Sequence, residues 1–280
     1  MINVNGELLS PNSKVFKLTN RGYLFGDSLF ETIKVNQGKI LFWEDHYFRL
    51  MASMRILRID IPMNFTMEFF ESEIHKTLEA NGLKEEIVRV RLNVDRGQGG
   101  LYLPLKNSIV NYSISVRLLE EKEYAISDNQ DCVVDLYKDF YVSPGLLSGL
   151  KTNNKNIQVL GSVYASENDY QNCLVLNTNK SVVEALNGNL FLVKDNHIAT
   201  PPLEDGCLRG IFRKQLIKLL KNNPNYTFEE RSISPFELQK ADELFITNTI
   251  KGIIPVSKYR KKTYGNDVAK ALLADINHNL

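Results

Sequence analysis

The sequence predicts an α+β protein with two domains. Its 280 residues exceed the length of one ordinary domain. Segments of helical period and segments of alternating polarity follow one another without the regular order of a barrel or a doubly wound sheet. Residues 120–130 are polar and charged and show no clean period. We therefore expect an N-terminal domain at 1–119, a linker at 120–130 and a C-terminal domain at 131–280.

Three segments of the N-terminal domain alternate in polarity, as half-buried strands do. Residues 28–35 place Leu29, Ile33 and Val35 on one side of an extended chain. Apolar side chains at the even positions of 88–94 and of 112–118 alternate with polar ones. A glycine-rich loop at 96–100 follows the second of these predicted strands.

Two helices are expected between the first and second of those strands. From Trp43 onward, apolar residues recur at spacings of three and four, and the pattern stops before Pro62. A second helix is expected after Asn64, a residue type common at helix N-caps, with Asn81-Gly82 as its end.

The C-terminal domain mixes short strands with two helices. Asp195-Asn196 is a good hairpin turn between apolar segments. The helix at 208–220 is strongly amphipathic and ends at Lys221-Asn222-Asn223-Pro224. The other helix carries Ile157, Leu160 and Tyr164, and strands are expected at 132–137, 174–176, 190–193 and 243–247.

Composition favours a small-molecule partner in the cytoplasm. The net charge of +1 gives no bulk reason to expect a nucleic-acid or membrane-surface partner. Cys132, Cys173 and Cys207 are too widely spaced for a C-x-x-C pair and predict reduced thiols. The N-terminus lacks an export signal, and no stretch approaches the roughly 18 apolar residues of a membrane span.

Standard catalytic and metal motifs are missing from the sequence. It contains no G-x-x-x-x-G-K-[ST], G-x-S-x-G or H-E-x-x-H pattern. Glu71 and His75 stand four residues apart, a spacing more typical of a helix-surface pair than of metal ligands. The basic run at 258–262 lacks aromatic platforms and indicates a solvated face. We expect no metal.

Six short segments together resemble one family across almost the whole chain. They are YLFGDSLFETIKV at 23–35, HYFRL at 46–50, GLKTNN at 149–154, VVEALNGNLF at 182–191, TPPLEDGCLRGIFR at 200–213 and FITNTIKGIIPV at 245–256. In order and spacing they resemble the fold-type-IV pyridoxal-phosphate enzymes, also called class IV aminotransferases. The resemblance implies a smaller N-terminal α/β sandwich, a larger β-barrel-like α/β domain, pyridoxal 5'-phosphate as cofactor and a homodimer.

Two residues match the family's positions for the reactive part of the cofactor. Lys151 matches the lysine that forms a Schiff base and moves the substrate's Cα proton. A lysine in this role must be neutral part of the time, so its pKa must be lowered by burial or by nearby cations. Glu184 matches the acid that pairs with the protonated pyridine nitrogen. Outside this pattern, Lys151 would be a surface lysine and Glu184 an edge-strand charge.

The resemblance also implies a set of phosphate ligands. Gly210 would let the anion approach the start of the helix at 208–220, where the backbone N–H groups of Ile211 and Phe212 point at it. Arg49, Asn248 and Thr249 match the family's remaining cofactor-binding positions. Arg49 could otherwise be a snorkelling helix residue, and Thr249 an ordinary residue at a strand end.

Within the family, the sequence favours a lyase. Branched-chain aminotransferases usually read FEGIR in the first motif, where this chain has FETIK, and carry a tyrosine where it has Asn156. The loop at 95–102 lacks the Arg-x-His carboxylate trap of the D-amino-acid enzymes. It looks more like the Ser-Arg-Gly-x-Gly-Gly stretch of 4-amino-4-deoxychorismate lyase, which releases pyruvate and 4-aminobenzoate for folate synthesis.

Two alternatives stay open beside the lyase. One is an aminotransferase acting on branched-chain or D-amino acids with a 2-oxo acid. The other is a catalytically silent relative that only binds a partner, although Lys151 and Glu184 are both present. Because the lyase substrate has two carboxylates, we expect an arginine to bind it, and Arg96 is the candidate against a plain loop charge.

Overall fold

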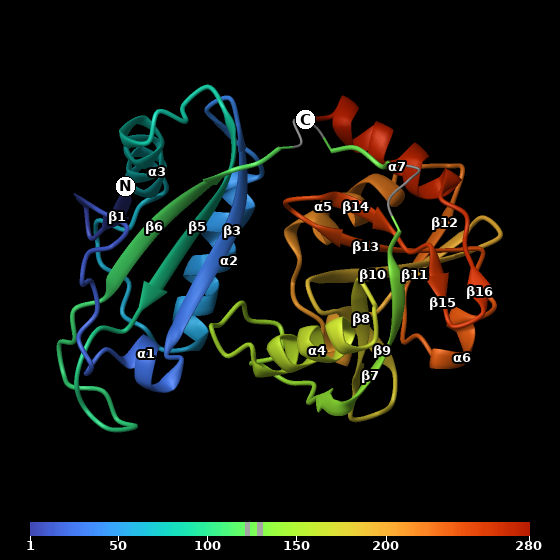
Figure 1. The fold of residues 1–280 in the computed structure, drawn as a ribbon, viewed down its shortest axis with the longest axis horizontal. Helices are drawn as coiled ribbons and strands as arrows, with labels where there is room; N and C mark the ends of the chain where they lie inside the picture. Colours follow the sequence, from blue (N-terminus) through green and yellow to red (C-terminus); the bar gives the residue numbers. More distant parts are fainter. Residues whose placement is uncertain (121–123, 128–130) are drawn as a thin grey trace. The chain divides into compact units, whose positions relative to one another are not determined.

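The protein divides into two units. A computed structural model describes residues 1–120, 124–127 and 131–280. Backbone contacts group Met1–Lys122 with Lys151–Asn154 in a first unit, and Glu123–Leu150 with Lys155–Leu280 in a second (Figure 1). The short segment Lys151–Asn154 thus belongs with the first unit although it lies far along the chain. The expected linker at 120–130 lies partly outside the described residues, and the division at 1–119 and 131–280 stays a prediction.

The first unit is a six-stranded antiparallel sheet with two long helices on one face. The strand order is β2-β1-β6-β5-β3-β4. Apolar side chains of α2 and α3, including Leu50, Met54, Phe70 and Ile74, share one buried core with those of the sheet. The strands are β1 (Ile2–Val4), β2 (Glu7–Leu9), β3 (Ser28–Asn36), β4 (Lys39–Ile40), β5 (Ile87–Asp95) and β6 (Asn111–Leu118), and the helices are α1 (Arg21–Phe25), α2 (Trp43–Ile56) and α3 (Met67–Ala80).

The expected N-cap of the second helix was wrong by two residues. Helix α3 begins at Met67, and its N-cap is Thr66, whose side chain accepts a hydrogen bond from the Phe69 N–H at 3.1 Å. Asn64 instead lies in the preceding turn, where its carbonyl accepts a bond from the Thr66 N–H. Threonine is also a favoured N-cap residue, and Thr66, which directly precedes the helix, caps it in place of Asn64.

The second unit is built on a branched ten-stranded sheet. Strand β10 pairs with β9 and β11 along one edge and with β13 along the other. Its strands are β7 (Val133–Val142), β8 (Asn172–Asn177), β9 (Val182–Ala185), β10 (Gly188–Lys194), β11 (His197–Thr200), β12 (Thr227–Glu230), β13 (Glu243–Asn248), β14 (Gly252–Pro255), β15 (Lys258–Tyr259) and β16 (Lys262–Thr263). Its helices are α4 (Asn156–Glu167), η1 (Leu203–Asp205), α5 (Ile211–Leu220), α6 (Pro235–Leu238) and α7 (Asp267–His278).

Two predicted boundaries in the second unit were also wrong. Helix α5 starts at Ile211 rather than Leu208, because the backbone of its N-cap residue, Gly210, is extended, with φ −65° and ψ 135°. Strand β7 runs on to Val142, with a register irregularity after Tyr137. The hairpin turn at Asp195-Asn196 is confirmed, since Val193 pairs with Ile198 on either side of it.

Candidate active site

The predicted site residues fall into two sets, one in each unit. Lys151 is held against the start of β3 by backbone hydrogen bonds. The Phe30 N–H donates to the Lys151 carbonyl at 2.9 Å, and the Asn153 N–H donates to the Ser28 carbonyl at 3.1 Å. Thr152 bridges to Leu29 between them. The backbone of Lys151 is therefore fixed by β3, and its Nζ lies 4.4 Å from the centre of the Phe30 ring.

A buried ion-pair cluster lies between β3 and α2 in the same unit. Arg49 donates to Glu31 through two of its nitrogens, with Nε at 2.8 Å from Oε1 and Nη2 on Oε2. The Nδ1 of His46 lies 2.7 Å from the same carboxylate. Burial by itself raises the pKa of Glu31, but the Arg49 charge and the His46 bond outweigh it and lower the pKa to about 2. Glu31 is therefore ionised at neutral pH.

His46 is neutral in this cluster. Burial lowers its pKa, and the Arg49 and Lys151 charges lower it further against the opposing effect of Glu31. Since an ionised carboxylate only accepts hydrogen bonds, Nδ1 carries the proton and donates to Glu31. The Nε2 atom is then an acceptor, and it is buried without a hydrogen-bond partner among the described residues.

In the second unit, Glu184 belongs to a row of polar residues across three strands. Glu184 on β9 lies opposite Asn189 on β10, and Asn189 lies opposite Thr247 on β13. Residues directly opposite in antiparallel strands point to the same face. The Glu184 carboxylate is buried and accepts a 2.8 Å hydrogen bond from the Leu208 N–H. Thr247 is 1% exposed, and its Oγ1 has no hydrogen-bond partner among the described residues.

The N-terminus of α5 lies against this row. Asn189 donates from Nδ2 to the Leu208 carbonyl at 2.9 Å, just before the helix starts. A Cβ added at Gly210, the N-cap, would come 1.9 Å from the Asn189 Oδ1. Only glycine allows this approach, and it leaves no side chain over the first turn. A helix start of this kind offers backbone N–H groups that an anion can bind, and Ile211 supplies the first of them.

Phe212 and Thr249 are linked through Tyr124. The rings of Tyr124 and Phe212 meet edge to face with centroids 5.3 Å apart. The Tyr124 hydroxyl donates to the Thr249 carbonyl at 2.7 Å. Asn248 lies at the end of β13. Its Oδ1 accepts hydrogen bonds from the N–H groups of Ile250 and Lys251, two and three residues later. The turn after β13 is thus fixed beside the first turn of α5.

Arg96 makes structural contacts within the first unit. Its Nε donates to Asp27 at 2.7 Å, and its two terminal nitrogens donate to the carbonyls of Arg58 and Leu57. A carboxylate ligand would compete with these bonds. The role of Arg96 in substrate binding stays a prediction.

Glu31, His46, Phe30 and Asn189 are site residues that the sequence analysis did not single out. The sequence does contain a signal for Glu31. This residue lies on the same side of its strand as the apolar Leu29, Ile33 and Val35, and an acid on that buried side requires a buried cation. For Asn189 no local pattern gives the role, because its contact with Gly210 depends on a loop twenty residues away.

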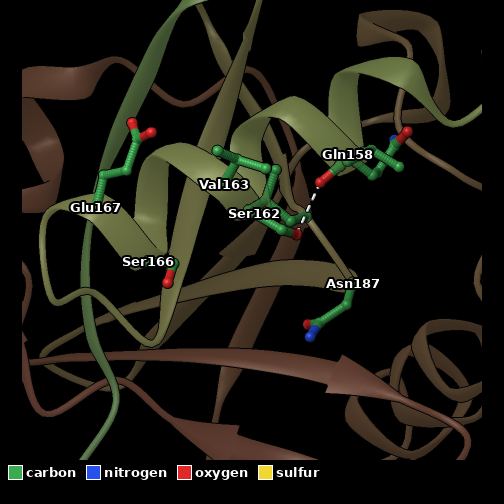
Figure 2. Close-up of a pocket in the computed structure, with 8 residues that line it drawn as sticks. Gln158, Ser162, Val163, Ser166, Glu167 and Asn187 are labelled. Atoms are coloured by element: carbon green, nitrogen blue, oxygen red, sulfur yellow. Dashed lines mark hydrogen bonds between the residues drawn. The ribbon is translucent and has the colours of Figure 1, made fainter.

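A surface groove of about 650 Å³ runs along α4 and is separate from these residues. It is lined by apolar and polar side chains of the helix, among them the acidic Glu167, and by Leu186 and Asn187 (Figure 2). The Ser162 hydroxyl turns back onto its own helix and donates to the Gln158 carbonyl at 2.7 Å. None of the predicted site residues lines this groove.

The donors present suit pyridoxal phosphate. The cofactor needs a lysine for its aldehyde, a carboxylate for its ring nitrogen and N–H or O–H donors for its phosphate. The buried Glu184 carboxylate suits the ring nitrogen. The uncovered start of α5 and the unpartnered Thr247 hydroxyl offer N–H and O–H donors for the phosphate. Lys151, fixed at its backbone, matches the first. The fold and these residues define a pyridoxal-phosphate enzyme.

Comparison with known proteins gives the family. The model of the family "Amino-transferase class IV" matches residues 28–259, so the chain belongs to this family. A putative branched-chain-amino-acid aminotransferase of Methanocaldococcus jannaschii is 30% identical over 95% of this chain and 90% of that protein. An aminodeoxychorismate lyase of Vibrio harveyi is 28% identical over 86% of both. The protein is therefore a pyridoxal-phosphate-dependent aminotransferase or lyase.

A solved structure supports the fold over its full length. The 4-amino-4-deoxychorismate lyase of Pseudomonas aeruginosa superposes with a TM-score of 0.83 at 25% identity, covering 100% of this chain and 98% of that one. In the described part of the chain, no helix is both long and apolar enough to cross a membrane. Nor do the described His, Cys, Asp and Glu side chains gather in a group that could hold a metal ion.

Proposed function

We propose that the protein is a 4-amino-4-deoxychorismate lyase that releases pyruvate and 4-aminobenzoate. The observation that carries this is the loop after β5, which resembles the lyase stretch in sequence. Its glycines are required by its shape, because Gly97, Gly99 and Gly100 all have positive φ. A Cβ at Gly97 would come 2.1 Å from the Ile109 carbonyl oxygen. The Vibrio harveyi and Pseudomonas aeruginosa lyases support the proposal.

The proposed roles follow the residues described above. When bound, the cofactor supplies an electron sink for negative charge at the substrate's amino carbon. Lys151 links to the cofactor and moves the proton at that carbon. Glu184 accepts a hydrogen bond from the ring nitrogen. The remaining cofactor ligands hold the phosphate and are Arg49, Asn248, Thr249 and the backbone of Gly210, Ile211 and Phe212.

Product analysis separates the lyase from an aminotransferase. The purified holoenzyme is expected to release pyruvate and 4-aminobenzoate from 4-amino-4-deoxychorismate in equal amounts without an added 2-oxo acid. Its visible absorbance band should persist during turnover, since a lyase returns its cofactor unchanged each cycle. Loss of that band on adding D-alanine or L-leucine, with activity only when a 2-oxo acid follows, would contradict the proposal.

An aminotransferase is the second candidate function. The 30% identity to the Methanocaldococcus jannaschii protein favours it, and the same cofactor residues would serve it. A purified protein that shows no cofactor absorbance would instead favour a silent binding relative.

We also propose that the protein forms a homodimer through the loop that follows Gly100. This loop exposes Leu101, Tyr102 and Leu103 by 81%, 89% and 83%. It is nevertheless held in place, because the buried Arg21 donates to the carbonyls of Gly99, Leu101 and Tyr102. A fixed loop that presents apolar side chains is typical of a protein interface.

Light scattering with size exclusion tests the dimer. The wild-type chain of 32.0 kDa should elute at twice that mass, and L101S combined with L103S should elute as a monomer. The matched control is M63S, which removes another apolar side chain that is 99% exposed in the same unit. A wild-type monomer, or a dimer that survives L101S/L103S, would count against this interface.

We propose a reducing compartment, the cytoplasm, as its location. Cys132, Cys173 and Cys207 are all buried and none forms a disulfide. Burial raises the pKa of the Cys132 and Cys173 thiols to about 11, so they stay protonated at neutral pH.

A further inference from the structure

Tyr124 is a buried aromatic residue in a polar stretch of the chain. It is the one aromatic residue of the predicted linker at 120–130, whose composition predicts a solvated segment. Tyr124 is nevertheless only 4% exposed. Because a buried hydroxyl costs free energy unless it is hydrogen-bonded, the partners of this side chain indicate what it does.

The Tyr124 hydroxyl fixes the turn between β13 and β14. Asn248 at the end of β13 pairs with the first residue of β14, so three residues form the loop between them. The hydroxyl donates to the Thr249 carbonyl at 2.7 Å. The N–H of the same peptide group, that of Ile250, donates to the Asn248 Oδ1 at 3.0 Å. The peptide group that follows Thr249 is therefore held at both its oxygen and its nitrogen.

The Tyr124 ring contacts both helix α5 and the start of β14. Its centroid lies 5.3 Å from that of Phe212, with the two ring planes at 82°. The ring also covers Gly252, where an added Cβ would come 2.9 Å from the Tyr124 Cδ1. Gly252 has a φ of +75°, which glycine adopts without strain. One side chain thus packs against the turn after β13 and against the first turn of α5.

The backbone of Tyr124 is attached to helix α7. Asn277 donates from Nδ2 to the Tyr124 carbonyl at 2.8 Å. Helix α7 in turn packs against α5, β13 and β14 (Figure 1). All of these contacts lie within the second unit. Burial raises the pKa of Tyr124, so its hydroxyl keeps its proton and remains a donor to Thr249.

We propose that Tyr124 is a positioning residue for the phosphate of the cofactor. Thr249 and the N-terminus of α5 come from different parts of the chain, and a phosphate that binds to both needs them held in a fixed arrangement. Tyr124 contacts both and acts through Thr249 and Phe212 rather than on the phosphate itself. Groups that are held in place before binding lose less entropy when the ligand arrives. The inference rests on the phosphate ligands proposed above.

Three probes test this role on the full chain after its cofactor has been removed. They are pyridoxal phosphate, pyridoxal, which lacks the phosphate, and inorganic phosphate as a competitor of pyridoxal phosphate. Y124F is expected to weaken the binding of pyridoxal phosphate and of inorganic phosphate by about 2- to 10-fold, the range for one hydrogen bond between neutral groups. The affinity for pyridoxal should stay nearly unchanged, so the preference for the phosphorylated cofactor falls.

The matched control is Y264F. Tyr264 donates its hydroxyl to the Leu238 carbonyl at 2.6 Å in the same unit, and neither residue is a predicted phosphate ligand. This variant should leave all three affinities unchanged. Thermal melting shows whether Y124F and Y264F fold. Because each loses one hydroxyl-to-carbonyl bond, the two should melt at similar temperatures, and a general loss of stability would not explain a difference in phosphate binding.

Two results would overturn the proposal. They are unchanged phosphate binding by a folded Y124F, and equal weakening of pyridoxal phosphate and pyridoxal. The positioning role and the lyase activity fail separately. Phosphate-selective weakening in Y124F, with no cleavage of 4-amino-4-deoxychorismate by the wild type, refutes the lyase alone. Cleavage by the wild type, with all three affinities unchanged in Y124F, refutes the positioning role alone.

Discussion

Lys151→Ala is expected to abolish the visible cofactor band and to reduce turnover by about 10²- to 10⁴-fold, the usual contribution of a positioned proton-transfer group. The variant loses both the covalent link to the cofactor and the group that moves the proton at the amino carbon. Spectroscopy and product analysis on the same preparation measure the two effects. Turnover should not recover on adding excess cofactor, because the missing amine cannot be supplied by binding alone.

The structure indicates that this variant will fold. The Lys151 segment is attached to β3 through backbone groups, which the substitution leaves in place. The matched control is Lys138→Ala, which removes an exposed lysine from β7 and should keep both the band and the activity. A folded Lys151→Ala protein that retains the band would show that another lysine carries the cofactor.

The parts of the fold that sequence predicts well are those with local patterns. The alternation at 88–94 and 112–118 corresponds to β5 and β6, and the period from Trp43 corresponds to α2. Each of these elements buries one complete face, so its period is visible in the residues themselves. The start of α5 was missed because the apolar period includes Leu208, whereas the backbone of Gly210, two residues later, is extended and lies outside the helix.

The candidate site also depends on contacts between residues that are distant in the sequence, which local patterns cannot predict. The position of Lys151 depends on a four-residue segment that pairs with β3, more than a hundred residues earlier. No periodicity marks such a segment, and only the resemblance in GLKTNN drew attention to it.

The Glu31 cluster connects the fold of the first unit to the proposed cofactor site. Glu31 receives two hydrogen bonds from Arg49, the predicted phosphate ligand, and fixes the plane of its guanidinium. His46 holds the same carboxylate from a second direction. Arg49 is thus positioned from within the core before any cofactor binds, which lowers the entropy cost of binding a phosphate.

Glu31→Gln is expected to lower the free energy of unfolding by about 3–5 kcal/mol, the usual cost of removing one partner from a buried ion pair. The amide keeps the shape of the side chain but leaves the Arg49 charge without its counterion. Urea denaturation measures the loss. The matched control Glu71→Gln changes an exposed acid on α3 and should stay within about 0.5 kcal/mol of the wild type.

The pH dependence provides a second, independent measure of the same interaction. Glu31 has a pKa of about 2 in the folded protein against a usual value of 4.5, so the unfolded chain takes up its proton first as the pH falls. Its contribution of about 3 kcal/mol is therefore complete above pH 4.5 and is lost progressively toward pH 2. The free energy of unfolding of Glu31→Gln should therefore fall less between pH 4.5 and pH 2 than that of the wild type. That of Glu71→Gln should fall as much as that of the wild type.

A double-mutant cycle then identifies Arg49 as the partner. If Glu31 is stabilised mainly by Arg49, the variant that carries both Glu31→Gln and Arg49→Gln should lose less stability than the sum of the two single variants. The reason is that the second substitution removes the buried charge that the first leaves uncompensated. Strictly additive losses, or a pH profile of Glu31→Gln that matches the wild type, would show that Glu31 does not hold Arg49 in place.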